Sequence, residues 1–210
     1  DLDRLSTAAY LSGHDAEFGG ILERLYRVHH DRGEPSAAVR AAIWLALMCL
    51  IRGEEGRASA WITRAERLVQ ECDGVERGYV AMVLAEQHLG CGRPDAAHAT
   101  AGQAVALADA FRDADLTAAA RHVQGRALIA QGHVAAGLRC LDEAMLAVVA
   151  GELAPIMTGL MYCSVIGTCR QVYALGRARE WTSAFATLCE HEPEMVAFTG
   201  TCLVHRAEIM

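Results

Sequence analysis

The residues best suited to catalysis in this sequence are a cysteine and a histidine that lie close together near its C-terminal end. The segment CEHEPE, residues 189–194, places Cys189 two positions from His191 among three glutamates. A cysteine becomes a strong nucleophile when a nearby histidine takes its proton. Residues this close in sequence at a helix end rarely form such a pair, so we interpret the segment as a solvated helix terminus. The sequence predicts no catalytic residue and a protein that is not an enzyme.

Nine histidines and eight cysteines also raise the question of a metal site. Structural zinc sites draw on closely spaced pairs of ligands, and no CxxC motif occurs here. His29 and His30 are adjacent, so their side chains diverge on a helix, while the six-residue separation of Cys163 and Cys169 turns these two away from each other. We therefore expect neither a metal ion nor a cofactor.

Three glycines interrupt the segment HVQGRALIAQGHVAAGLRC, which is otherwise rich in helix formers: Gly125, Gly132 and Gly137. A phosphate-binding loop needs a preceding strand and, in its strongest form, a lysine followed by serine or threonine, and neither is present. Glycine also serves at left-handed turns and at close contacts between helices. We predict that Gly132 forms a turn, and that Gly125 and Gly137 lie where two helices approach closely.

Composition predicts that helices alone build the fold. Of the 210 residues, 53% are hydrophobic but only 6% are aromatic, and alanine and leucine outnumber the β-branched residues that favour strands. The net charge is −7, and all 19 basic residues are arginines spread along the chain, which argues against a nucleic-acid-binding surface. The scattered cysteines predict a reducing, cytoplasmic location. The apolar runs are too short to cross a membrane, and no signal peptide is evident.

A glycine-centred pattern recurs along the chain. Glycines that end an apolar segment, each followed five positions later by a small or apolar residue, lie 40, 39, 40 and 44 residues apart: Gly13, Gly53, Gly92, Gly132 and Gly176. Small and apolar residues nine and twelve positions after each glycine share one helix face. The pattern predicts helix pairs over residues 4–32, 35–72, 75–111, 114–150 and 155–190, with an eleventh helix starting near Ala197. We interpret residues 1–210 as one all-α domain, an α-solenoid of about five helix-turn-helix units.

Two segments, GRASAWITRAERLVQE from Gly56 and GRPDAAHATAGQAVALA from Gly92, resemble the tetratricopeptide repeat, although the period of about 40 exceeds the usual 34 residues. Four further segments resemble actinobacterial LuxR-family transcriptional regulators of the MalT-like kind: DLDRLSTAAYLSG, AGELAPIMTGLMYCSVIGTC, YALGRAREWTSAF and VAFTGTCLVHRAEIM. The resemblance implies a right-handed solenoid of TPR-like repeats that senses a signal or binds a partner. In that family a helix-turn-helix domain follows the repeats, and this chain contains none, so no residue here is expected to contact DNA.

The resemblance also implies that the first helix of each pair lines a concave groove. At matching positions before the turns, this groove carries a polar line flanked by aromatic and other side chains, and our candidate binding residues are Tyr79, Glu86, His122, Arg126, Arg170 and Tyr173. Arginine pairs well with acidic groups, which suggests a protein, a peptide or a small effector with an acidic group. In the alternative interpretation, Glu86 neutralises Arg126 of the next unit in an intramolecular ladder.

The sequence ends at Met210, inside what resembles the first helix of a sixth repeat. An array without a polar cap exposes apolar surface. We therefore expect either a fragment of a longer regulator or a subunit whose open C-terminal end forms a homodimer. In the second case the chain is a purely architectural module without a ligand, and Leu203 is expected in the interface.

Overall fold

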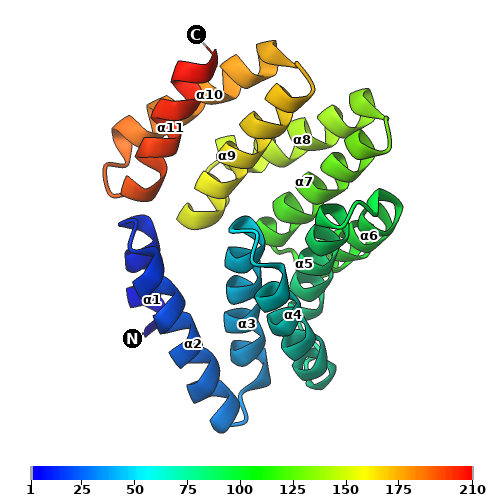
Figure 1. Ribbon diagram of the computed structural model, residues 1–210, viewed down its shortest axis with the longest axis vertical. Helices are drawn as coiled ribbons and strands as arrows, with labels where there is room; N and C mark the ends of the chain where they lie inside the picture. Colours follow the sequence, from blue (N-terminus) through cyan, green and yellow to red (C-terminus); the bar gives the residue numbers. More distant parts are fainter. Residues whose placement is uncertain (1, 210) are drawn as a thin grey trace.

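The fold consists of eleven α-helices and one short 3₁₀ helix, and the computed structural model describes residues 2–209 (Figure 1). No strand occurs within these residues, so the prediction of an all-α protein is confirmed. The helices are α1 (Leu2–Leu11), α2 (Asp15–Asp31), α3 (Pro35–Ile51), α4 (Glu55–Leu68), η1 (Val69–Glu71), α5 (Glu76–Gly90), α6 (Pro94–Phe111), α7 (Ala114–Ala130), α8 (Val134–Val149), α9 (Pro155–Gln171), α10 (Leu175–His191) and α11 (Val196–Ile209).

Local chemistry accounts for several helix boundaries. Pro35, Pro94 and Pro155 each occupy the first turn of a helix, where the missing amide hydrogen has no partner to lose. The side chain of Asp113 caps α7 by accepting a hydrogen bond from the amide of Leu116 at 2.8 Å. All five predicted helix pairs are present, and the eleventh helix begins at Val196, next to the predicted Ala197.

Four of the five predicted glycine turns are confirmed, because Gly13, Gly53, Gly92 and Gly132 all have positive φ angles, between 68° and 89°. The prediction for Gly176 is wrong. That residue lies inside α10, and the left-handed position of the fifth turn is held by Tyr173, whose φ is 57°. The hydrogen bond from the Ala174 amide to the Cys169 carbonyl, 2.8 Å, matches the one that closes the turn at Gly132. The turns are thus spaced more evenly than the glycines, 39–41 residues apart.

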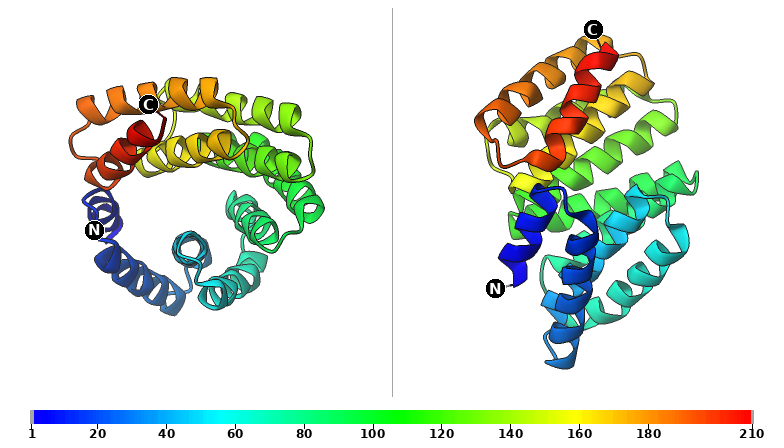
Figure 2. Two further views of the ribbon diagram at one scale, coloured as in Figure 1. Left: turned by 45° about the horizontal axis from the view of Figure 1, so that its top comes forward. Right: turned by 60° about the vertical axis from the view of Figure 1, so that its left-hand side comes forward.

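The helices form two layers. Each helix packs against its neighbours in sequence, and odd-numbered helices also contact one another, α3 with α5, α5 with α7 and α7 with α9. Within residues 2–209 no two even-numbered helices make such a contact. The odd-numbered helices therefore line the inner side of the curved array that Figure 2 shows, and the even-numbered helices cover its outer side.

Close packing between α7 and α8 depends on two glycines that face each other. A Cβ atom on Gly137 would collide with the carbonyl oxygen of Gly125 and with the side chain of Ile129, and a Cβ on Gly125 would lie 2.8 Å from the carbonyl oxygen of Gly137. Both residues are buried. The prediction that these glycines serve helix packing is confirmed.

The array curves until its last helix returns to its first (Figures 1 and 2). α11 contacts α1 and α9, and the ring of Tyr10 on α1 lies 5.8 Å from that of Phe198 on α11. Phe198 fits against Gly159 on α9, where a side chain would overlap its ring. The inward side of α11 is thus packed, while Val196, Leu203 and Val204 remain more than half exposed. We call the contact of α1 with α9 and α11 the seam.

Candidate functional site

A cavity of about 450 Å³ lies on the inner side of the array, between α3, α5, α7 and α9. Its volume falls within the range of sites that bind small molecules. Most of its wall is apolar, and the flexible side chains of Met82, Met157 and Met161 belong to it. The remaining apolar lining consists of Leu47, Leu50, Ile51, Gly90, Ala119, Val123, Leu160 and Cys163.

One cluster of polar side chains interrupts this apolar wall: Glu86, His122, Arg126 and Ser164. Nη1 of Arg126 donates to both carboxylate oxygens of Glu86, at 2.7 and 2.8 Å. Nε2 of His122 is hydrogen bonded to the hydroxyl oxygen of Ser164 at 2.7 Å. The other ring nitrogen, Nδ1, lies 4.0 Å from Oε1 of Glu86, beyond hydrogen-bonding distance. The cluster joins side chains of α5, α7 and α9.

His122 is neutral in this setting. Only 5% of the residue is exposed, and this burial, together with the positive charge of Arg126, lowers the pKa of His122 well below its ordinary value. The ion pair of Glu86 and Arg126 therefore contains all the charge at the cavity wall, and its two charges cancel.

Three of the six predicted site residues, Glu86, His122 and Arg126, are brought together in this cavity. Glu86 and Arg126 form the predicted intramolecular pair and also line a cavity. The binding-site interpretation and the intramolecular-pair interpretation of the sequence are therefore both compatible with these residues. The pairing is part of a wider pattern, in which polar contacts join residues 34–42 positions apart: Arg40 with Glu76, Tyr79 with Asp113, Asp142 with Arg177, and His122 with Ser164.

The other three predicted residues lie elsewhere. Arg170 pairs with Glu208 of α11 and does not line the cavity. Tyr173 is 85% exposed, since it forms the turn between α9 and α10. Both residues were predicted by counting back from Gly176, which lies three positions after the true turn residue. The predicted polar line from Glu86 through Arg126 to Arg170 is therefore not formed.

Tyr79 lines a second chamber of about 320 Å³ at the N-terminal ends of the inner helices. Its hydroxyl donates to Asp113 at 2.9 Å, and burial followed by the charge of that carboxylate raises the pKa of Tyr79. Burial also raises the pKa of Asp115, although the Ala154 amide that donates to it at 2.9 Å acts in the opposite direction. Met157 borders this chamber and the first cavity, so the two adjoin.

No sequence pattern indicates Ser164 as a site residue. Its partner His122 is 42 residues away, and the two meet only because α7 and α9 are neighbours in the inner layer. Met157 and Met161 were not predicted either, because methionines in an apolar helix are normally interpreted as core residues. Within residues 2–209, no group of three or more histidine, cysteine, aspartate or glutamate side chains is arranged to hold a metal ion.

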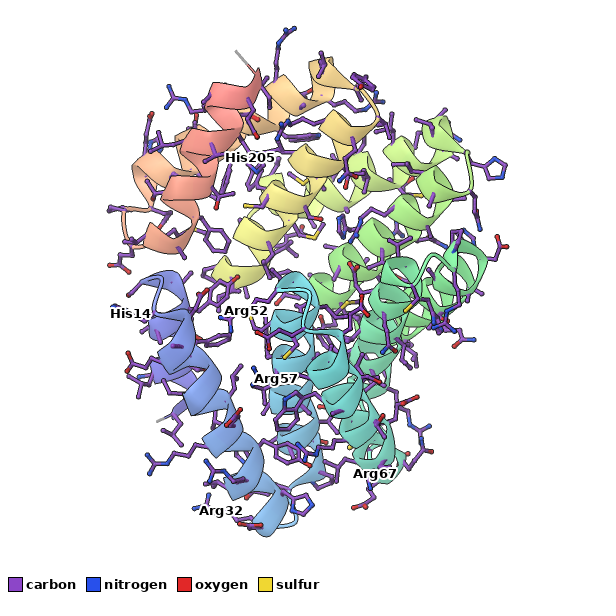
Figure 3. The ribbon with its side chains drawn as sticks, viewed as in Figure 1. His14, Arg32, Arg52, Arg57, Arg67 and His205 are labelled. Atoms are coloured by element: carbon purple, nitrogen blue, oxygen red, sulfur yellow. The ribbon has the colours of Figure 1, made fainter. Side chains whose placement is uncertain are left out.

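We expect His122 to make the protein sensitive to acid. The unfolded chain protonates this histidine near pH 6.5, while the folded state resists protonation, so stability is present above pH 6.5 and decreases as the pH falls below it. Each histidine of this kind contributes a slope of at most about 1.4 kcal/mol per pH unit. Burial also lowers the pKa values of His88 and of His205, so both act in the same direction. Figure 3 labels His205.

The measurement is urea unfolding followed by circular dichroism between pH 7.5 and 5. His122→Gln should flatten the profile, whereas the same change at the exposed His14 should leave it as in the wild type (Figure 3). Equal slopes for the wild type and His122→Gln would show that His122 is not the sensitive group.

No helix within residues 2–209 combines the length and the apolar character needed to cross a membrane. No protein-family model matches the chain, and no curated protein matches it significantly.

Proposed function

We propose that this chain is the non-enzymatic sensor domain of a transcriptional regulator of the LuxR type, and that it binds a small effector in the cavity between α3, α5, α7 and α9. In this proposal the helix pairs form a right-handed α-solenoid of five TPR-like repeats. The regular turns, the two helix layers and the resemblance of several segments to LuxR-family regulators support this part.

The observation that carries the proposal is the cavity itself, which combines an apolar wall with one cluster of polar side chains around the buried His122. An apolar pocket with a few convergent polar groups is the usual form of a small-molecule site. The curvature of the array favours a small effector over a long peptide, because the seam brings α1 back against α9 and α11 and limits the length of the inner side.

Such a site gives binding a direct route to a change in shape. A ligand in the cavity contacts four helices that belong to successive helix pairs. An occupant that fits one spacing of these helices better than another shifts the population towards that spacing. Small rotations between neighbouring units add along a solenoid, so the ends of the array move farther than the site does.

The test uses Nile red, an uncharged dye whose fluorescence rises in apolar surroundings, and we expect one bound dye per chain. Leu47 and Leu160 line the cavity from α3 and α9, so the double variant Leu47→Trp, Leu160→Trp fills it. Dye affinity should fall by about tenfold or more while the melting temperature is kept. Val149→Trp, on the exposed side of α8, is the matched control and should bind the dye as the wild type does.

A second function is favoured by the exposed apolar side chains of α11, namely homodimerisation without a ligand. If the filled variant binds Nile red as well as the wild type does, the cavity is not the site. A concentration-dependent dimer in sedimentation experiments that dissociates on Leu203→Glu would then establish the architectural role.

A further inference from the structure

The charges around the cavity restrict the ligand. Glu86 and Arg126 are the only charged residues among those that line it, and they are paired with each other. Because Nη1 of Arg126 already contacts both oxygens of Glu86, an acidic ligand would bring a second carboxylate to a guanidinium whose charge is neutralised. An unpaired charge in a largely apolar cavity is strongly unfavourable. An amine would meet the same difficulty at Glu86.

Hydrogen bonding at the cavity wall leaves a place for a ligand atom beside His122. His122 is 95% buried, and no described residue forms a hydrogen bond with its Nδ1. This nitrogen and Oε1 of Glu86 are 4.0 Å apart. An oxygen atom placed between them can lie about 2.8 Å from each, which is a normal hydrogen-bond length.

The two sides of this gap require different roles from the inserted atom. The carboxylate of Glu86 only accepts, and its negative charge favours the tautomer of His122 that carries its hydrogen on Nδ1. Ser164 then donates to Nε2 at 2.7 Å. The inserted group must accept from Nδ1 and donate to Oε1, and a hydroxyl does both.

We propose that the effector is an uncharged, mostly apolar small molecule with a hydroxyl group, and that this hydroxyl bridges His122 Nδ1 and Glu86 Oε1. Its apolar body lies against Met82, Met157 and Met161, whose flexible side chains adjust to its outline. This inference rests on the proposed function and replaces the acidic ligand that the arginines alone suggested.

The test compares three unbranched ligands of ten carbons each, decan-1-ol, decanoate and decylamine, by competition with Nile red. We expect the alcohol to bind the wild type about tenfold more tightly than either charged compound. Methionines labelled with ¹³C in their methyl groups should report alcohol binding as shifts of the Met82, Met157 and Met161 signals. The ¹⁵N signal of His122 Nδ1 should move on adding the alcohol, which tests the bridge without any substitution.

Glu86→Gln gives the sharper result, because it removes the negative member of the pair and leaves Arg126 available to an anion. In this variant the order should reverse, with decanoate binding more tightly than decan-1-ol. Glu143→Gln is the matched control, since Glu143 pairs with Arg121 at 2.5 Å outside the cavity, and it should keep the wild-type order.

The outcomes separate this inference from the proposed function. If Nile red binds in the cavity but decanoate displaces it better than the alcohol does in the wild type, the site holds and the uncharged hydroxyl ligand is wrong. An unmoved His122 signal at saturating alcohol would equally overturn the bridge. If neither the dye nor any of the three compounds binds, the proposed function fails first.

Discussion

Phe185→Ala is expected to lower the free energy of unfolding by about 3–5 kcal/mol, the range typical of large aromatic truncations in a core. Phe185 is fully buried on α10, stacked on Tyr162 of α9 at 4.9 Å between ring centroids and 6.4 Å from Phe198 of α11. Its loss leaves a hole where three helices meet. Urea unfolding followed by circular dichroism measures the change.

Phe111→Ala is the matched control for this substitution, because Phe111 is 46% exposed at the end of α6. A surface change of this kind should alter stability by about 0.5 kcal/mol or less. A similar, small effect for both variants would show that Phe185 does not hold α9, α10 and α11 together.

Gly137→Ala is expected to destabilise the fold by about 2–3 kcal/mol, although alanine is the better helix former. The added methyl group meets the backbone carbonyl of Gly125, which cannot rotate away as a side chain can, so α7 and α8 must separate. The two helices bury some of the largest side chains of the core at this contact, including Leu141. The loss of packing therefore exceeds the gain in helix propensity.

Gly167→Ala measures the effect of helix propensity on stability without a steric clash. Gly167 lies inside α9, and a Cβ there would meet no atom within 4 Å. This variant should be more stable than the wild type by about 0.5–1 kcal/mol. If Gly137→Ala is stabilising as well, the close approach of α7 and α8 is not needed.

The helices were predictable because their signals are local. Glycines at turns and a repeating apolar face located all five pairs from the sequence. The prediction of the fifth turn was wrong because only glycine was taken to mark a turn. At this turn Tyr173 adopts the left-handed conformation, which residues with side chains rarely take. Gly176, three residues later, fits the same glycine pattern. Every position counted from Gly176 is therefore displaced by three residues.

The candidate site was predictable only in part. Gly92 and Gly132 are true turns, so the positions counted from them are correct. Glu86, His122 and Arg126 therefore lie together on consecutive inner helices, as predicted. Ser164 and the return of α11 to α1 depend on curvature accumulated over the whole array, which no local pattern records. The electrostatic consequence also needed the structure, because only the observed pairing shows that the charge of Arg126 is already satisfied.

The seam between α1, α9 and α11 joins helices that lie far apart in the sequence. Elsewhere along the array, consecutive helices are connected by short turns. Tyr10 and Phe198 are both buried at this contact. Their burial therefore favours the strongly curved form of the array over a more extended one.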